Sequence, residues 1–116
     1  MPPFDAALLL QEYGDAGLVR DLAQLLVDTT PPQMDAVQSA VAAGDAVALR
    51  AAAHKLRGSI VAFGMAEAVE AARKLEMMGA AGDLGGADTL CGELVAGVQS
   101  LRDSARAWLD SGGGLP

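Results

Sequence analysis

Residues 45–64 read DAVALRAAAHKLRGSIVAFG, and this stretch decides the fold class. Its apolar residues recur at the helical period of about 3.6 residues, without the alternation that is typical of a strand. Aspartate is a common N-cap residue, so Asp45 is suited to begin a helix. Glycine commonly ends helices, so Gly64 is suited to end it. The stretch therefore predicts one amphipathic helix. The apolar side of that helix carries Leu49, Ala53, Leu56, Ile60 and Phe63.

The segments on either side also show helical spacing between prolines and glycines. We expect a short helix over about 5–13 and a second one from about residue 17 into the Pro31-Pro32 break. A third segment ends at Gly44. Pro32 can begin this third segment or kink one longer helix, because proline is tolerated in a first turn. Beyond Gly64 we expect helices over about 66–78 and 87–109, with Gly79 ending the first of them and a loop or a badly frayed helix end over 79–86.

The composition agrees with a single helical domain. The chain has 116 residues, of which 52% are hydrophobic and only 3% aromatic. Small and unbranched side chains favour close helix packing over sheets. We predict an all-α fold, an antiparallel up-and-down four-helix bundle with a short extra N-terminal helix. The domain is expected over 1–110, and 111–116 as a flexible C-terminal tail.

Several classes of function are disfavoured by the composition. One cysteine and one histidine exclude an internal disulfide and a thiolate metal site, and we expect no metal and no cofactor. A net charge of −7 argues against nucleic acids and anionic membranes as partners. No apolar run approaches the roughly 20 residues of a spanning helix. The first residues do not resemble a signal peptide, so we expect a cytoplasmic protein with protein partners.

The only histidine, His54, is predicted to point toward solvent. At about 100° per residue it lies roughly 150° from the middle of the apolar stripe. Arg50 and Gly58 lie one helical turn away on either side, and Arg57 is at i+3. A lone histidine is more often structural, and Gly58 alone would equally fit a helix irregularity or a tight crossing with a neighbouring helix.

The cations around His54 suit phosphoryl chemistry. Although the chain is acidic, Arg50, Lys55 and Arg57 fall close together in the sequence. Nearby cations favour a neutral imidazole, whose nitrogen is a good nucleophile near pH 7. Guanidinium groups can also bind the oxygens of an attached phosphoryl group. A solvated charged face is the alternative explanation for Arg50 or Lys55 taken alone.

These residues belong to a longer pattern. Residues 53–59 read AHKLRGS, followed by Gly64 and by the pair Leu75-Glu76. This resembles the signature of the histidine-containing phosphotransfer (HPt) domain family, which is Ala-His-x-Leu-Lys-Gly-Ser, a later glycine, and Leu-Glu in the following helix. Gly44-Asp45 resembles the turn before the active-site helix of that family. Arg57 replaces the usual lysine, and Ile60 and Val61 are bulkier than the residues common there.

The resemblance implies a four-helix bundle that carries a phosphoryl group on Nε2 of His54. Arg57, Gly58, Lys55 and Arg50 would support the phosphoryl group. The partners implied are the receiver domain of a response regulator and a hybrid or sensor histidine kinase. We expect no kinase activity of the chain's own, because no nucleotide-binding motif is present.

Two other functions stay open. The chain could be the substrate domain of a chemotaxis-type histidine kinase, although the dimerisation and ATP-binding domains that normally follow are absent here. It could also be a helical module that binds a receiver or kinase without phosphorylation. A monomer is expected, since the His54 face must stay open. The cognate partners, the direction of phosphoryl flow and the output are not encoded in any motif that we recognise.

Overall fold

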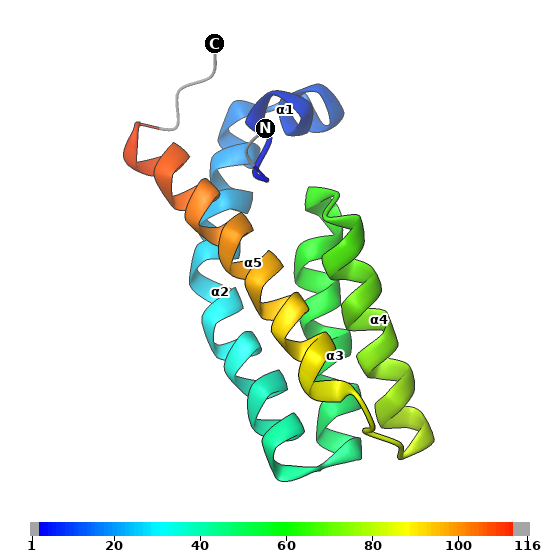
Figure 1. Ribbon diagram of the computed structural model, residues 1–116. Coiled ribbons are helices and arrows are strands. Elements are labelled where there is room, and N and C mark those ends of the chain that lie inside the picture. Colours follow the sequence, from blue (N-terminus) through cyan, green and yellow to red (C-terminus); the bar gives the residue numbers. More distant parts are fainter. Residues whose placement is uncertain (1–2, 113–116) are drawn as a thin grey trace.

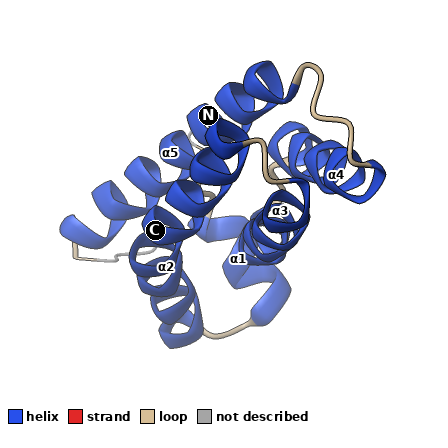
Figure 2. Ribbon diagram, turned by 90° about the horizontal axis from the view of Figure 1, so that it is seen from below, coloured by secondary structure: helices blue, strands red, loops and turns tan. Residues whose placement is uncertain are grey.

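The computed structural model describes residues 3–112, and within them all regular structure is helical (Figures 1 and 2). The elements are α1 (Ala6–Tyr13), α2 (Ala16–Ala43), α3 (Ala46–Ile60), the 3₁₀ turn η1 (Val61–Phe63), α4 (Ala66–Ala81) and α5 (Ala87–Asp110). The all-α prediction is confirmed. The predicted tail falls partly on Ser111 and Gly112, which form a turn, and otherwise on 113–116, which lie outside the described residues.

Aspartates begin the first three helices. The side chain of Asp5 accepts a hydrogen bond from the backbone N–H of Leu8, and that of Asp45 accepts one from Ala48. Asp15 caps α2 in the same way. Each cap satisfies backbone donors that have no partner within the helix. The cap predicted at Asp45 is therefore present, and it sets where the helix carrying His54 begins.

The two segments expected around Pro31-Pro32 form one continuous helix, α2. Pro31 has no N–H to donate to the carbonyl of Val27, one turn earlier. Instead, Nε of Arg102 in α5 donates to that carbonyl at 3.0 Å. The buried Thr30 hydroxyl donates to the carbonyl of Leu26 at 2.7 Å. The Arg102 contact replaces the hydrogen bond that Pro31 cannot make and so offsets part of the cost of a proline pair inside α2.

The long helices surround one apolar core. α3 packs against α2 and α4, and α5 packs against the same two helices. From α2 to α5 they run in alternating directions along the long axis of the molecule, and α1 lies across one end (Figure 1). The core contains the fully buried side chains Leu26, Leu49, Leu56, Ile60, Leu75, Leu94 and Leu101. No helix among residues 3–112 has the length and apolar character needed to cross a bilayer.

The prediction that Gly79 ends its helix is wrong. α4 continues to Ala81 and ends at Gly82, whose φ of 72° is the left-handed value that glycine adopts most easily. Gly79 is instead buried inside the helix. A glycine count along the sequence cannot distinguish these cases, because one glycine serves a turn and the other a close contact with α3.

Candidate functional site

His54 lies near the middle of α3 and points away from the core. Leu49, Ala53 and Leu56 of the same helix are fully buried, so the apolar stripe faces inward. The side chain of His54 keeps 69% of its surface exposed. The exposure predicted from the helical period is confirmed, and the imidazole is open to a partner molecule.

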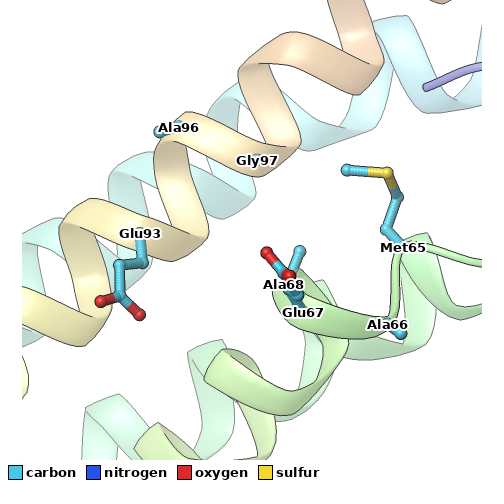
Figure 3. Close-up of a pocket in the computed structure, with 7 residues that line it drawn as sticks. All are labelled: Met65, Ala66, Glu67, Ala68, Glu93, Ala96 and Gly97. Atoms are coloured by element: carbon cyan, nitrogen blue, oxygen red, sulfur yellow. The ribbon is translucent and has the colours of Figure 1, made fainter. Parts of the chain in front are cut away.

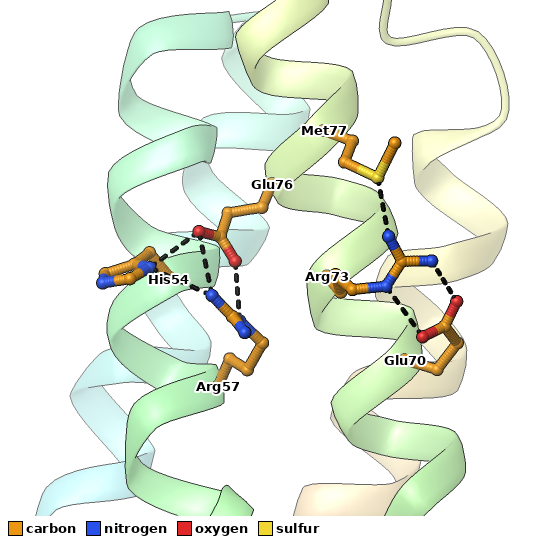
Figure 4. Close-up of polar contacts among 6 residues, drawn as sticks. All are labelled: His54, Arg57, Glu70, Arg73, Glu76 and Met77. Carbon is orange, nitrogen blue, oxygen red and sulfur yellow. Dashed lines mark hydrogen bonds and ion pairs between the residues drawn. The ribbon is translucent and has the colours of Figure 1, made fainter.

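A carboxylate from α4 reaches this imidazole. Oε1 of Glu76 lies 2.7 Å from Nδ1 of His54 (Figure 4). Oε2 of Glu76 accepts a 2.7 Å hydrogen bond from Nε of Arg57, and Nη2 of Arg57 lies 3.3 Å from Oε1. The Glu76 side chain is only 18% exposed. One carboxylate thus joins the two side chains that α3 presents on consecutive turns.

The charge on Glu76 follows from its surroundings. Partial burial on its own would raise the pKa of this carboxyl group, but the hydrogen bonds from Arg57 and His54 outweigh it. Together they hold the pKa of Glu76 below its ordinary value. Glu76 is therefore an anion at neutral pH and can only accept hydrogen bonds. The proton in its contact with His54 must be carried by Nδ1.

A second contact at Nδ1 does not change this assignment. Nη2 of Arg57 lies 3.3 Å from Nδ1 of His54, but a guanidinium can only donate and would need an unprotonated Nδ1. The contact with Glu76 is shorter and involves a charged acceptor, so it is the stronger of the two. In the neutral ring, a proton on Nδ1 leaves the lone pair on Nε2. In Figure 4 this outer nitrogen points away from both Glu76 and Arg57.

Gly58 and Arg50 lie on the His54 side of α3. Gly58 is exposed, and a Cβ added there would meet no atom within 4 Å outside its local helix backbone. The tight-crossing explanation of Gly58 is therefore excluded, and the space beside the imidazole is open. Arg50 is exposed and borders, with His54 and Glu76, a shallow depression of about 430 Å³.

Lys55 lies on a different side of the helix. It borders a second depression with Thr29 and Pro32 of α2, away from the pocket that contains His54. The structure brings together His54, Arg57, Gly58 and Arg50, and it leaves Lys55 apart. We therefore keep Lys55 outside the site that we propose below.

A family model described as the Hpt domain matches residues 21–107, which is about three quarters of the chain. The chain belongs to the Hpt domain family. Hpt domains take part in histidine phosphotransfer in phosphorelays, as carriers and not as kinases. Searches of curated proteins and of solved structures found no match. The matched part of this Hpt domain includes all of α3 and α4, and α1 lies outside it.

Glu76 is the residue of the Hpt domain site that sequence reasoning left out. The signal was present, since Leu75-Glu76 is part of the family pattern. Its role was hidden because Glu76 follows His54 by 22 positions, and nothing in the intervening sequence indicates that the two side chains touch. Only the packing of α4 on α3 brings them together.

A larger depression of this Hpt domain, of about 580 Å³, lies between α4 and α5 (Figure 3). Glu67 and Glu93 border it together with Met65 and small residues, and none of the residues around His54 takes part. Residues 3–112 contain no group of three or more His, Cys, Asp and Glu side chains that is arranged to hold a metal ion.

Proposed function

We propose that this Hpt domain is a phosphocarrier in a two-component phosphorelay. His54 accepts a phosphoryl group from the aspartyl phosphate of a receiver domain, or from a kinase, and passes it to the receiver domain of a response regulator. The observation that carries this proposal is the 2.7 Å contact of Nδ1 with Glu76 on an exposed imidazole, which makes Nε2 the attacking nitrogen of the neutral ring.

The transfer follows from that arrangement. The lone pair of Nε2 attacks the phosphorus, an N–P bond forms, and the P–O bond to the donor aspartate breaks to release a carboxylate. Nδ1 keeps its proton, so the phosphorylated ring is a cation beside the Glu76 anion, which stabilises it. In the second transfer a receiver aspartate attacks the phosphorus, and Nε2 recovers its lone pair.

Arg57 has a role that differs from the one expected from the sequence. Its Nε and Nη2 groups already bind Glu76, so its first role is to hold that carboxylate in place. A guanidinium has five N–H donors, and those left over are free to bind phosphoryl oxygens. Gly58 keeps the surface next to the imidazole low, which lets the active site of a receiver approach.

We also propose a helix arrangement, a location, an oligomeric state and partners for this chain. α2 to α5 are taken as an antiparallel up-and-down four-helix bundle, with α1 as the short extra helix. We propose a cytoplasmic monomer, since an open His54 face is needed for docking. Response-regulator receivers and hybrid or sensor kinases are the proposed partners, and nucleic acids and membranes are not.

The direct test is transfer of label. The purified chain is incubated with receiver domains carrying a labelled phosphoryl group, together with Mg²⁺ for the receiver. The label should appear on the wild-type chain, be lost in acid and survive in base, and be missing from His54→Gln. ATP and Mg²⁺ without a partner should leave the chain unlabelled. Label that persists on His54→Gln would disprove the assignment.

The same variant separates the two alternatives. A helical binding module would hold its receiver or kinase equally well after His54→Gln and would take up no label from any of them. The substrate domain of a chemotaxis-type kinase would take label from that class of kinase and pass it to a receiver, but would not accept label back from a phosphorelay receiver.

A further inference from the structure

Among the glycines of residues 3–112, Gly79 is the one where an added Cβ would come nearest to another helix, and it lies one turn from Glu76. Gly79 of α4 is buried, and a Cβ added to it would lie 2.7 Å from the carbonyl oxygen of Ala46. The same Cβ would lie 2.7 Å from the backbone nitrogen of Arg50 and 2.9 Å from its Cβ. Two of these three atoms belong to the backbone of α3, so a rotamer change cannot relieve the clash.

We propose that Gly79 is a positioning residue, which sets the spacing of α3 and α4 so that Glu76 reaches Nδ1 of His54. Gly79 follows Glu76 by three residues, and Arg50 precedes His54 by four. Because the two helices run in opposite directions (Figure 1), these offsets place the Gly79–Arg50 contact next to the Glu76–His54 contact. This inference rests on the proposed function for its importance, but not for its geometry.

The size of the effect can be judged from contact distances. Ordinary contacts of a Cβ begin at 3.4 Å, so a Cβ at position 79, at 2.7 Å from two backbone atoms, requires the helices to separate by roughly 0.7 Å. The hydrogen bond between Glu76 and His54 is 2.7 Å long. An equal lengthening takes it to or beyond the limit of about 3.2 Å for such a bond. A single methyl group is thus enough to weaken the contact that selects the tautomer.

The Glu76 side chain has limited freedom to compensate. Its second oxygen is bound to Nε of Arg57, which lies one turn further along α3. A carboxylate that stretches toward His54 must give up part of that ion pair. Helix spacing therefore controls both contacts of the carboxylate together.

The test uses the neutral imidazole of the single histidine, which gives one pair of ring nitrogen signals. The full chain is labelled with ¹⁵N, and the Nδ1–H and Nε2–H tautomers are quantified by NMR. Gly79→Ala should move the tautomer ratio about tenfold toward Nε2–H, as expected for a weakened charge-assisted hydrogen bond. It should also slow phosphoryl transfer by a similar factor.

Two other glycines provide matched controls. A Cβ at Gly97 would lie 3.2 Å from Cβ of Ala68, at a contact between α4 and α5 that is over two turns along α4 from Glu76. A Cβ at Gly92 would meet no atom within 4 Å. Gly97→Ala should strain the fold and Gly92→Ala should not. Neither should change the tautomer ratio of His54.

Glu76→Asp is the second variant, and it leaves the contact of Gly79 with α3 unchanged. It shortens the carboxylate by one methylene and imitates a wider spacing, so it should shift the tautomer ratio in the same direction. If Gly79→Ala folds and keeps the wild-type ratio, the proposal is overturned. If Gly79→Ala does not fold and Glu76→Asp keeps that ratio, it is overturned as well. A protein that shifts its tautomer but never takes up label would refute the phosphocarrier function and leave the role of Gly79 intact.

Discussion

Nδ1 of His54 lies 2.7 Å from Oε1 of Glu76, across the interface between α3 and α4. Arg57 binds the other oxygen of the same carboxylate, also at 2.7 Å. The imidazole is therefore oriented by a residue of a different helix, and that residue is held by the helix of the imidazole itself. This arrangement predicts how substitutions at Glu76, Arg57 and Gly58 change phosphoryl transfer and stability.

Glu76→Gln tests the charge on the carboxylate. The amide oxygen can still accept a hydrogen bond from Nδ1, but bonds to a neutral group are about half as strong as those to an ionised one. We expect transfer to His54 to slow about tenfold in a chain that still folds, with only a modest fall in the melting temperature. Stopped transfer together with a melted protein would show instead that Glu76 serves the fold.

Substitutions at Arg57 should affect phosphoryl transfer without unfolding the chain. Arg57→Ala removes the group that holds Glu76 and a donor for phosphoryl oxygens, so transfer should slow while the helices stay folded. Arg57→Lys keeps a cation but loses the paired donors of a guanidinium, and its effect should be smaller. Transfer rates measured beside thermal melts check both. Wild-type transfer rates in both variants would contradict the orienting role of Arg57.

Gly58→Leu should stabilise the chain while it blocks the site. Leucine has a higher helix propensity than glycine, worth roughly 0.5–1 kcal/mol at this exposed position. Its side chain should obstruct the approach of a receiver to His54 and slow transfer. Gly58→Ala is the matched control, because it gains the propensity with far less bulk. A Gly58→Leu chain that is stabilised and transfers at the normal rate would exclude a docking role for this surface.

Stability should depend on pH through Glu76. Its pKa is lowered in the folded chain, so its ionised form stabilises the fold above the ordinary carboxyl pKa of about 4.3. That contribution is lost as the pH falls through the lowered folded value. The difference in unfolding free energy between wild type and Glu76→Gln should shrink from pH 7 to pH 3. Glu93→Gln, at an exposed position without an ion pair among the described residues, should show no such trend.

The sequence predicted those features that depend on neighbouring residues. The helical class, the cap at Asp45 and the outward direction of His54 follow from period and residue type, and all three are present. The resemblance also included Leu75-Glu76 in the family pattern, but it did not predict the contact between Glu76 and His54. Local patterns are sufficient for these features because a helix repeats over a few residues.

The features that were missed depend on residues far apart in the chain. Continuity of α2 through Pro31 relies on Arg102, which is 75 residues away from the carbonyl that it binds. Gly79 looked like a helix end because its partner surface, at Ala46 and Arg50, belongs to another helix. Neither contact can be predicted from the hydrophobic period of the sequence. Both emerge only from how the helices pack.

The most direct measurement is the position of the phosphoryl group on the imidazole of His54. The ¹⁵N-labelled chain is phosphorylated by a receiver, and coupling between phosphorus and the ring nitrogens is recorded by NMR. We predict coupling to Nε2, with Nδ1 still protonated beside Glu76. A phosphoryl group on Nδ1, or on any residue other than His54, would contradict the central claim.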